Sequence, residues 1–226
     1  MQVIILAAGR GTRMAPLTDT MPKPMLKVLD KNLIEWKLEA LPDTVTGITM
    51  VVGYLQETIR DYFGSSWKNI PITYVEQKNL DGTGGAVLLC KDTIIDKALI
   101  LMGDDIYTQE DLENLSQYDF ALMSYDEGEA ALARKGQVIE KEGLLVGLNE
   151  GDMQSGTPST FINTGACVLS KTFFDYPLVK FSETEYGLPH TLVSLCKEIP
   201  VHIVHATRWI QITSPECLKK AESSLS

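Results

Sequence analysis

The chain has few cysteines, and none of them stands at the spacing of a metal site. The sequence contains neither a CxxC pair nor a cysteine with a histidine at ligand spacing. Such pairs are typical of zinc sites and redox motifs, and dense cysteine is typical of small secreted scaffolds. We therefore expect free, buried thiols in a reducing compartment, which makes the cytoplasm the expected location. The four cysteines are Cys90, Cys167, Cys196 and Cys217.

Positive charge and long apolar runs are also scarce. The formal net charge is −10 and the sequence pI is near 4.8. Nucleic acids and anionic membrane surfaces bind basic faces, so neither is an expected partner. No run in the sequence approaches the ~20 apolar residues of a membrane span, and no basic segment precedes an apolar stretch at its start.

Familiar catalytic motifs are missing as well. The sequence has no GxSxG motif, and its three histidines belong to no nucleophile motif. The glycine-rich segment after the first apolar run is not a GxxxxGK[ST] phosphate loop, because no Lys-Ser or Lys-Thr follows at that spacing. It is not a GxGxxG dinucleotide motif either, since Gly9 and Gly11 match its first half but Met14 takes the place of the third glycine.

Segments with strand and helix patterns alternate along the first half. With 226 residues and 44% hydrophobic content, the chain can bury one α/β core, and we predict a single domain over 1–226. The alternation predicts a parallel sheet with helices on both faces. We expect strands at 3–7, 48–52, 72–75 and 98–102, helices at 32–41, 55–63 and 86–91, and a glycine-rich loop at 77–85 before the last helix.

The second half is less regular. A hairpin of 137–139 and 144–148 is predicted to turn at Glu142 and Gly143, and 151–159 has the composition of a polar loop. The remaining predicted elements are strands at 120–124, 161–169 and 201–204, and helices around 112–115, 188–197 and 215–223.

Three special segments each follow an apolar strand. Gly9 and Gly11 would let main-chain N–H groups approach a polyanion, and Arg13 and Lys23 would supply positive charge for phosphate oxygens. The loop 77–85 follows the third strand, and Asp104 follows the fourth. Parallel sheets bind ligands at the carboxyl ends of their strands, so one site is predicted there. The plain alternative is a set of glycine and aspartate turns.

The segments LAAGRGTRM and PKPML together closely resemble the sugar-phosphate nucleotidylyltransferases, which join a nucleoside triphosphate to a sugar 1-phosphate. The resemblance implies a three-layer α/β/α Rossmann-like sandwich with a mostly parallel mixed sheet, the nucleotide-diphospho-sugar transferase fold. It implies Mg²⁺ as cofactor and Arg13 and Lys23 as catalytic residues. It leaves the oligomeric state open, with a homo-oligomer as one option. The implied nucleotide contacts in this segment are Leu6, Ala8, Gly9, Gly11 and Thr12.

The same resemblance assigns roles further along the chain. Gln77, Gly82 and Thr83 match the nucleobase loop, and an amide that both donates and accepts suits the edge of uracil or thymine. Asp104 matches the metal ligand, because carboxylate oxygens hold Mg²⁺. Gly136, Glu150 and Asn163 stand where the family contacts sugar hydroxyls; the alternatives are a surface charge for Glu150 and backbone satisfaction for Asn163.

Two positions depart from the family pattern. Gln211 stands where a second metal carboxylate is expected, and an amide oxygen can ligate Mg²⁺ but brings no charge. Gly151 stands where many members carry a lysine for the sugar phosphate. Both departures affect the phosphate and metal centre.

The expected function is transfer of a nucleotidyl group from UTP or dTTP to a sugar 1-phosphate, with release of pyrophosphate. No protein base is needed, because the attacking phosphate is already an anion. A phosphocholine cytidylyltransferase is one alternative, which an aromatic cage for the quaternary ammonium would favour. A nucleotide-binding regulatory homologue that has lost transfer activity is another, and a metal-dependent glycosyltransferase is a weaker one.

Overall fold

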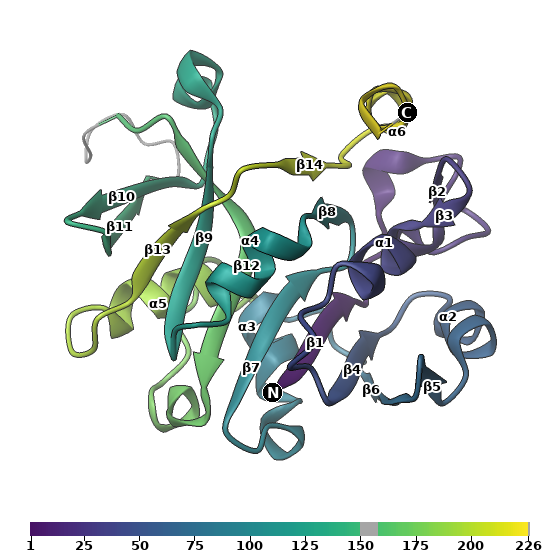
Figure 1. Ribbon diagram of the computed structural model, residues 1–226, viewed down its shortest axis with the longest axis horizontal. Helices are drawn as coiled ribbons and strands as arrows, with labels where there is room; N and C mark the ends of the chain where they lie inside the picture. The colour runs from purple at the N-terminus through teal and green to yellow at the C-terminus, as the bar shows by residue number, and fades with distance from the viewer. Residues whose placement is uncertain (150–157, 226) are drawn as a thin grey trace.

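The computed structural model describes residues 1–149 and 158–225 and centres on a ten-stranded mixed sheet (Figure 1). The strand order is β10-β11-β13-β9-β12-β7-β1-β4-β6-β5. Seven of these strands point the same way, and only β12, β11 and β5 run against them. The predicted mixed, mostly parallel sheet is therefore confirmed.

The parallel part of the sheet is built by the first half of the chain. β1 lies between β4 and β7 and is parallel to both, and β4 in turn pairs with β6. Leu6 and Met102 are register partners, so β1 and β7 end side by side. The bounds are β1 (Gln2–Ala7), β4 (Gly47–Val52), β5 (Ser66–Trp67), β6 (Ile70–Glu76) and β7 (Lys97–Met102).

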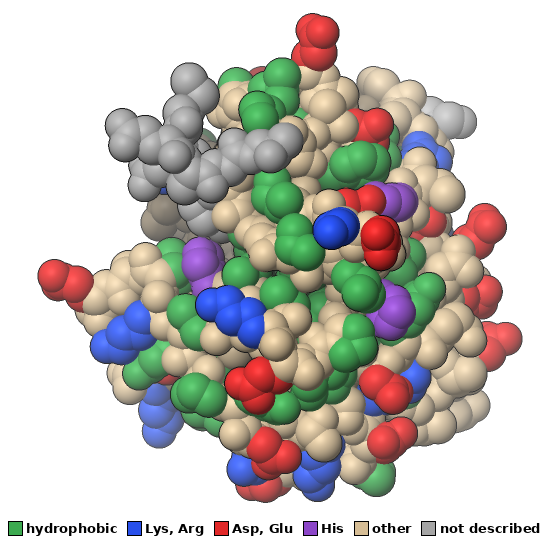
Figure 2. All heavy atoms as spheres, turned by 90° about the vertical axis from the view of Figure 1, so that its left-hand side faces the viewer, with side chains coloured by type: hydrophobic (Ala, Val, Ile, Leu, Met, Phe, Trp, Pro, Cys, Tyr) green, Lys and Arg blue, Asp and Glu red, His purple; other side chains and the backbone are tan. Residues whose placement is uncertain are grey.

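The second half adds the antiparallel strand β12 and the outer strands. The predicted hairpin is present as β10 and β11, and its turn residues Glu142 and Gly143 both have positive φ. Figure 2 shows the side of the molecule that carries β10, β11 and β13, where basic and acidic side chains are interspersed. The bounds are β9 (Phe120–Asp126), β10 (Gln137–Lys141), β11 (Leu144–Asn149), β12 (Phe161–Ser170) and β13 (His202–His205).

Helices cover both faces of the sheet, as Figure 1 shows. Along β1, Val3, Ile5 and Ala7 pack into one core cluster and Ile4 and Leu6 into the other. This double burial explains the uninterrupted apolar run. The first cluster includes side chains of α1 (Leu33–Glu39), α2 (Gln56–Phe63) and α4 (Gln109–Leu115), and the second includes side chains of α3 (Gly82–Leu88) and α5 (Leu188–Leu195).

A third cluster holds the C-terminal helix against the N-terminal loops. Ile212 and Ala221 pack with Met14, Leu26 and Ile106. This contact places β14 beside the carboxyl end of β7, because β14 pairs antiparallel with β8, the short strand after Asp104. The elements are α6 (Pro215–Leu225), β8 (Asp105–Tyr107), β14 (Trp209–Gln211) and the two-stranded pair β2 (Lys27–Val28) and β3 (Lys31–Asn32).

The prediction for the glycine-rich segment was wrong in its boundary. The helix begins at Gly82, not at residue 86. Glycine lowers helix propensity, which is why the sequence predicted a loop. Here packing decides: a Cβ on Gly84 would lie 3.1 Å from the Tyr186 carbonyl oxygen, and one on Gly85 would lie 2.2 Å from Asp81 Oδ1. Only glycine lets this helix approach its neighbours so closely.

Candidate active site

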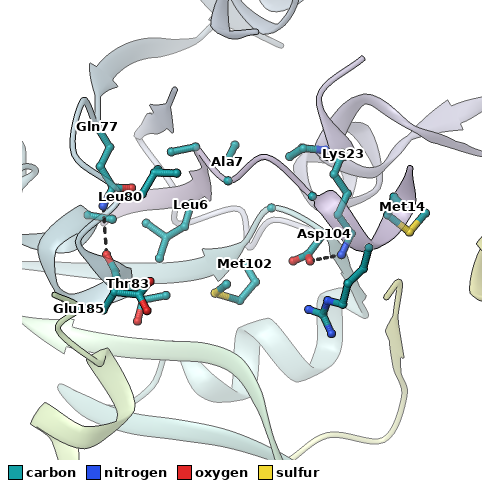
Figure 3. A pocket seen from close by; sticks show the side chains of 18 residues that line it. Leu6, Ala7, Met14, Lys23, Gln77, Leu80, Thr83, Met102, Asp104 and Glu185 are labelled. Atoms are coloured by element: carbon teal, nitrogen blue, oxygen red, sulfur yellow. Dashed lines mark hydrogen bonds and ion pairs between the residues drawn. The ribbon is translucent and has the colours of Figure 1, made fainter. Parts of the chain in front are cut away.

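A cavity of about 310 Å³ opens at the carboxyl ends of the parallel strands. In Figure 3, Lys23 and Asp104 lie at one end of it, Gln77, Leu80 and Thr83 lie at the other, and Leu6 and Met102 lie between. Most of its walls come from the last residues of β1 and β7 and from the three predicted segments that follow β1, β6 and β7. The other lining residues are Ala7, Ala8, Gly9, Gly11, Arg13, Met14, Pro24, Gly82, Ala86, Gly103 and Glu185.

The glycine corner after β1 packs directly on the PKP segment. Gly11 has φ of 63°, and a Cβ at this position would lie 2.7 Å from Lys23 Cβ. The Thr18 hydroxyl donates to the Gly11 carbonyl at 3.0 Å. Thr12 begins the short 3-10 helix Thr12–Met14 and is the one predicted nucleotide contact of this corner that is not part of the cavity wall. Glycine at position 11 thus allows the loop and Lys23 to share one small volume.

Lys23 and Asp104 meet across the cavity. Lys23 Nζ lies 2.5 Å from Asp104 Oδ2, although 81 residues separate them in sequence. Lys23 is only 6% exposed, whereas the Asp104 carboxylate keeps 27% of its side-chain surface open. An ammonium and a carboxylate that lie this close together and are largely shielded from water form a strong, charge-assisted hydrogen bond. The predicted convergence of these two segments is present in the structure.

The opposite end of the cavity is formed by Gln77 and the start of α3. Gln77 Nε2 donates to Asp81 Oδ1 at 2.9 Å and to the Gly82 carbonyl at 3.1 Å. Both partners are acceptors, so they fix which end of the Gln77 amide is the nitrogen. The amide oxygen, Oε1, is the group that remains to accept a hydrogen bond. The Thr83 hydroxyl accepts a hydrogen bond from the Leu188 N–H at 3.0 Å, which joins this end to α5.

A second cavity of about 260 Å³ adjoins the first and contains the predicted sugar residue Asn163. The two cavities share Arg13, Thr83, Met102 and Asp104. The Asn163 N–H donates to the Gly136 carbonyl at 2.9 Å, so these two predicted residues are neighbours.

Asn163 Oδ1 accepts a hydrogen bond from the Gly165 N–H at 2.9 Å. This is the contact expected under the alternative interpretation, in which the Asn163 side chain satisfies a backbone group. Its amide nitrogen makes no hydrogen bond to another described residue. Glu150 and Gly151 lie outside the described residues.

Comparisons with known proteins show the family of the chain. The family described as "Nucleotidyl transferase" matches residues 2–130, more than half of the chain. The chain belongs to this family.

Individual members of the family are similar to this chain in sequence. The "Bifunctional protein GlmU" of Methanocaldococcus jannaschii is 36% identical over 201 residues, which cover 88% of this chain and 47% of that protein. The "UTP--glucose-1-phosphate uridylyltransferase AglF" of Haloferax volcanii is 35% identical over 108 residues, covering 47% of this chain and 44% of that one. The chain spans about half the length of the curated relatives it matches.

A solved structure supports the fold. A UDP-glucose pyrophosphorylase complexed with UDP-glucose superposes with a TM-score of 0.81 and 22% identity, covering 99% of this chain and 97% of that one. The fold predicted from the resemblance, a nucleotide-diphospho-sugar transferase fold, is confirmed. Among the described residues, no helix has the length and apolar character to cross a membrane.

Gln211, the departure from the family pattern, has a partner that the sequence did not predict. β14 places Gln211 opposite Asp105, and its Oε1 accepts a hydrogen bond from Arg134 Nη2 at 2.7 Å. The amide oxygen that was predicted as a metal ligand is thus beside a guanidinium, which disfavours a cation there. Arg134 follows the 3-10 helix Gly128–Ala133 and belongs to a basic pair before Gly136, which is not by itself a functional motif.

The remaining oxygens fit the Mg²⁺ that the family implies. Asp104 offers its carboxylate, and the neighbouring Asp105 has a buried Oδ1 with no hydrogen-bond partner among the described residues. Among the described residues, no three or more histidine, cysteine, aspartate or glutamate side chains lie close enough together to hold a metal ion. Mg²⁺ is commonly held by one or two carboxylates together with substrate phosphates, so Asp104 with Asp105 suits it.

A fully buried lysine lies beneath this acidic pair. Lys37 on α1 is 0% exposed and donates from Nζ to the Leu33 carbonyl at 2.9 Å. Burial lowers its pKa from 10.5 to about 8, although Asp105 and Asp104 oppose the shift. Burial also raises the pKa of Asp105 well above its ordinary value, with Asp104 adding to the effect. The interior beneath the site therefore penalises charge of both signs.

Lys37→Met is expected to raise the free energy of unfolding at neutral pH by ~1–3 kcal/mol, because a buried charge is replaced by an apolar chain of similar length. The pKa of Lys37 in the folded chain, about 8, is below its ordinary 10.5. The unfolded chain therefore binds more protons between these values, and wild-type stability rises with pH across them. Urea unfolding at neutral and alkaline pH should show this rise in the wild type and in the exposed control Lys31→Met, but not in Lys37→Met. An unchanged slope in Lys37→Met would contradict the assignment.

Proposed function

We propose that the chain is a Mg²⁺-dependent sugar-1-phosphate nucleotidylyltransferase, with residues 1–226 as one nucleotidyltransferase domain. The observation that carries the proposal is the Lys23–Asp104 contact at 2.5 Å, in a cavity that joins the Gln77 loop on one side and the Asn163 cavity on the other. A triphosphate laid along this cavity places its base at the Gln77 end and its phosphates at the Lys23 end. The core cluster that unites β1 with β12 supports one domain.

The reaction is an in-line displacement at phosphorus. A phosphate oxygen of the sugar 1-phosphate attacks the α-phosphorus, the bond from the α-phosphorus to the bridging oxygen breaks, and pyrophosphate leaves with that oxygen. The chain contributes position and positive charge: Lys23 and Arg13 neutralise the phosphate oxygens, and Gly9 and Gly11 let main-chain N–H groups approach them. Mg²⁺ at Asp104 and Asp105 supplies further charge neutralisation when bound.

The orientation of Gln77 supports uracil or thymine as the base. Its Nε2 is held by Asp81 and Gly82, so the Oε1 remains to accept a hydrogen bond. The N3 of uracil and thymine carries a hydrogen, whereas the N3 of cytosine is itself an acceptor. A cytosine bound with its N3 at this oxygen would set two acceptors against each other. The uridylyltransferase named among the relatives agrees with this choice.

We expect kcat/KM for UTP or dTTP to exceed that for CTP by at least ~10-fold, since an unpaired buried acceptor costs about 1–3 kcal/mol. Gln77→Ala should reduce the ratio to near one, and Gln117→Ala, on an exposed surface, should leave it unchanged. Initial rates with each triphosphate measure the ratio of the kcat/KM values. Equal use of CTP by the wild type would remove Gln77 from base selection.

The function itself is tested by pyrophosphate release from a panel of nucleoside triphosphates, each with sugar 1-phosphates or phosphocholine. The cavity next to Asp104 contains no aromatic side chain among its described residues, which argues against a cage for choline. Turnover with a sugar 1-phosphate supports the proposal. Turnover with phosphocholine and CTP favours the cytidylyltransferase, and thermal stabilisation by nucleotide without turnover favours the regulatory homologue.

A further inference from the structure

A third cavity, of about 650 Å³, lies on the other side of Gln211 between β14, α6 and the 3-10 helix Gly128–Ala133. Three basic side chains contribute to its wall, namely Arg13, Arg134 and Lys220, against one acidic side chain, Glu127. The chain as a whole carries a net charge of −10. A local surplus of positive charge in an acidic protein attracts anions to that place.

This cationic cavity is connected to both cavities of the active site. Arg13 lines all three of them, and Gln211 lines both the cationic cavity and the cavity that contains Asn163 and Asp104. Arg13 and Gln211 therefore mark the place where the cationic cavity adjoins the Asn163 cavity.

Arg134 is held in one position by three contacts. Its Nη1 pairs with Glu127, its Nη2 donates to Gln211 Oε1 at 2.7 Å, and its guanidinium carbon lies 5.8 Å from the centre of the Trp209 ring. A guanidinium carries five N–H donors, so this arrangement leaves donors for a further acceptor. Because the fork is already ordered, binding an anion costs little additional side-chain entropy.

The charge at this point suits the acceptor substrate. The reaction proposed above requires the phosphate of the sugar 1-phosphate to lie between the Asn163 cavity and the α-phosphate at Asp104. Gln211 contributes to the wall of that space and also to the wall of the cationic cavity, where Arg134 donates to its amide oxygen, so the two cavities meet at this pair. A guanidinium binds phosphate oxygens in a planar, two-pronged geometry that the other basic residue, lysine, does not offer.

We infer that Arg134, held against Gln211, binds the phosphate of the acceptor sugar 1-phosphate and sets its position for attack. The inference rests on the proposed function. It makes Arg134 a substrate-positioning residue that no local sequence pattern singles out.

Isothermal titration of glucose 1-phosphate and, separately, inorganic pyrophosphate into the wild type, Arg134→Gln, Arg134→Lys and Lys135→Gln tests it. Lys135→Gln removes the same charge from the neighbouring exposed residue. We expect Arg134→Gln to weaken glucose 1-phosphate binding at least ~10-fold, about 1.4 kcal/mol, with pyrophosphate binding unchanged. Arg134→Lys should restore part of the affinity, and Lys135→Gln should bind as the wild type does.

Steady-state kinetics separates this inference from the function on which it rests. In Arg134→Gln the KM for the sugar 1-phosphate should rise by the same factor, while the KM for the triphosphate stays within about twofold. A wild type that binds glucose 1-phosphate but shows no turnover would contradict the proposed function and leave the binding result to decide on Arg134. Three results would overturn the inference. Arg134→Gln could lose pyrophosphate binding alone, or Arg134→Gln and Lys135→Gln could have equal effects. The third is a wild type that does not bind glucose 1-phosphate.

Discussion

Lys23→Ala and Asp104→Asn are each expected to lower kcat/KM by at least ~100-fold, roughly 2.7 kcal/mol of transition-state stabilisation. Lys23 is the buried cation of the cavity proposed for the triphosphate, and its removal leaves Asp104 without the ammonium that now lies 2.5 Å from it. Asp104→Asn keeps the shape but removes the negative charge that would hold Mg²⁺. A coupled assay for pyrophosphate, with saturating Mg²⁺, measures both losses.

Lys31→Ala is the matched control for Lys23→Ala. Lys31 also forms a short ion pair, with Glu39 at 2.6 Å, but about a third of its side chain is exposed. Exposed pairs contribute about 0–1 kcal/mol, so this variant should turn over at the wild-type rate. Near wild-type kcat/KM in Lys23→Ala or Asp104→Asn would remove that residue from the mechanism.

Gly82→Ala is expected to have the second largest effect, with loss of nucleotide binding and a destabilisation of ~2–4 kcal/mol. Gly82 has φ of 92°, and a Cβ there would lie 2.4 Å from the Tyr186 carbonyl oxygen. The backbone of α3 must then shift, and the Gly82 carbonyl that holds Gln77 shifts with it. Titration of UTP and chemical denaturation measure the two consequences.

Gly128→Ala separates backbone strain from the clash. Gly128 also has a positive φ, of 60°, but no atom lies within 4 Å of its added Cβ. Strain alone costs about 1–2 kcal/mol, and UTP binding should be retained. If Gly82→Ala were no worse than Gly128→Ala in both measurements, the close approach to Tyr186 would have no functional role.

The sequence predicted the parts of the site that depend on strands and their ends. A continuous apolar run identifies a strand buried on both faces, and the carboxyl ends of parallel strands meet at one edge, so the proximity of Lys23 and Asp104 followed from local patterns. The start of α3 could not be predicted in this way. Its glycines indicate a loop by propensity, and the helix forms because Tyr186 and Asp81 leave no room for a Cβ.

Arg134 escaped prediction for a different reason. Its contact with Gln211 joins positions 77 residues apart, through a 3-10 helix on one side and a three-residue strand on the other. Neither element has a periodicity that a sequence can display. The substitution at 211 was visible in the sequence, but the side chain that accompanies it was visible only in the fold.

The hydrogen bond from the Gly103 N–H to the Leu6 carbonyl, at 2.9 Å, carries the sheet ladder to the residue before Asp104. The end of the cavity proposed to bind the phosphates is therefore joined by main-chain hydrogen bonds to two central strands of the sheet, β1 and β7. The parts of the site proposed to contact the base and the sugar are carried by other strands, β6 and β12, and by the segments that follow them. Substrate choice can consequently diverge through changes in those outer walls while the chemical step keeps its geometry, and engineering for a new sugar should begin at β12 and leave the β1–β7 junction untouched.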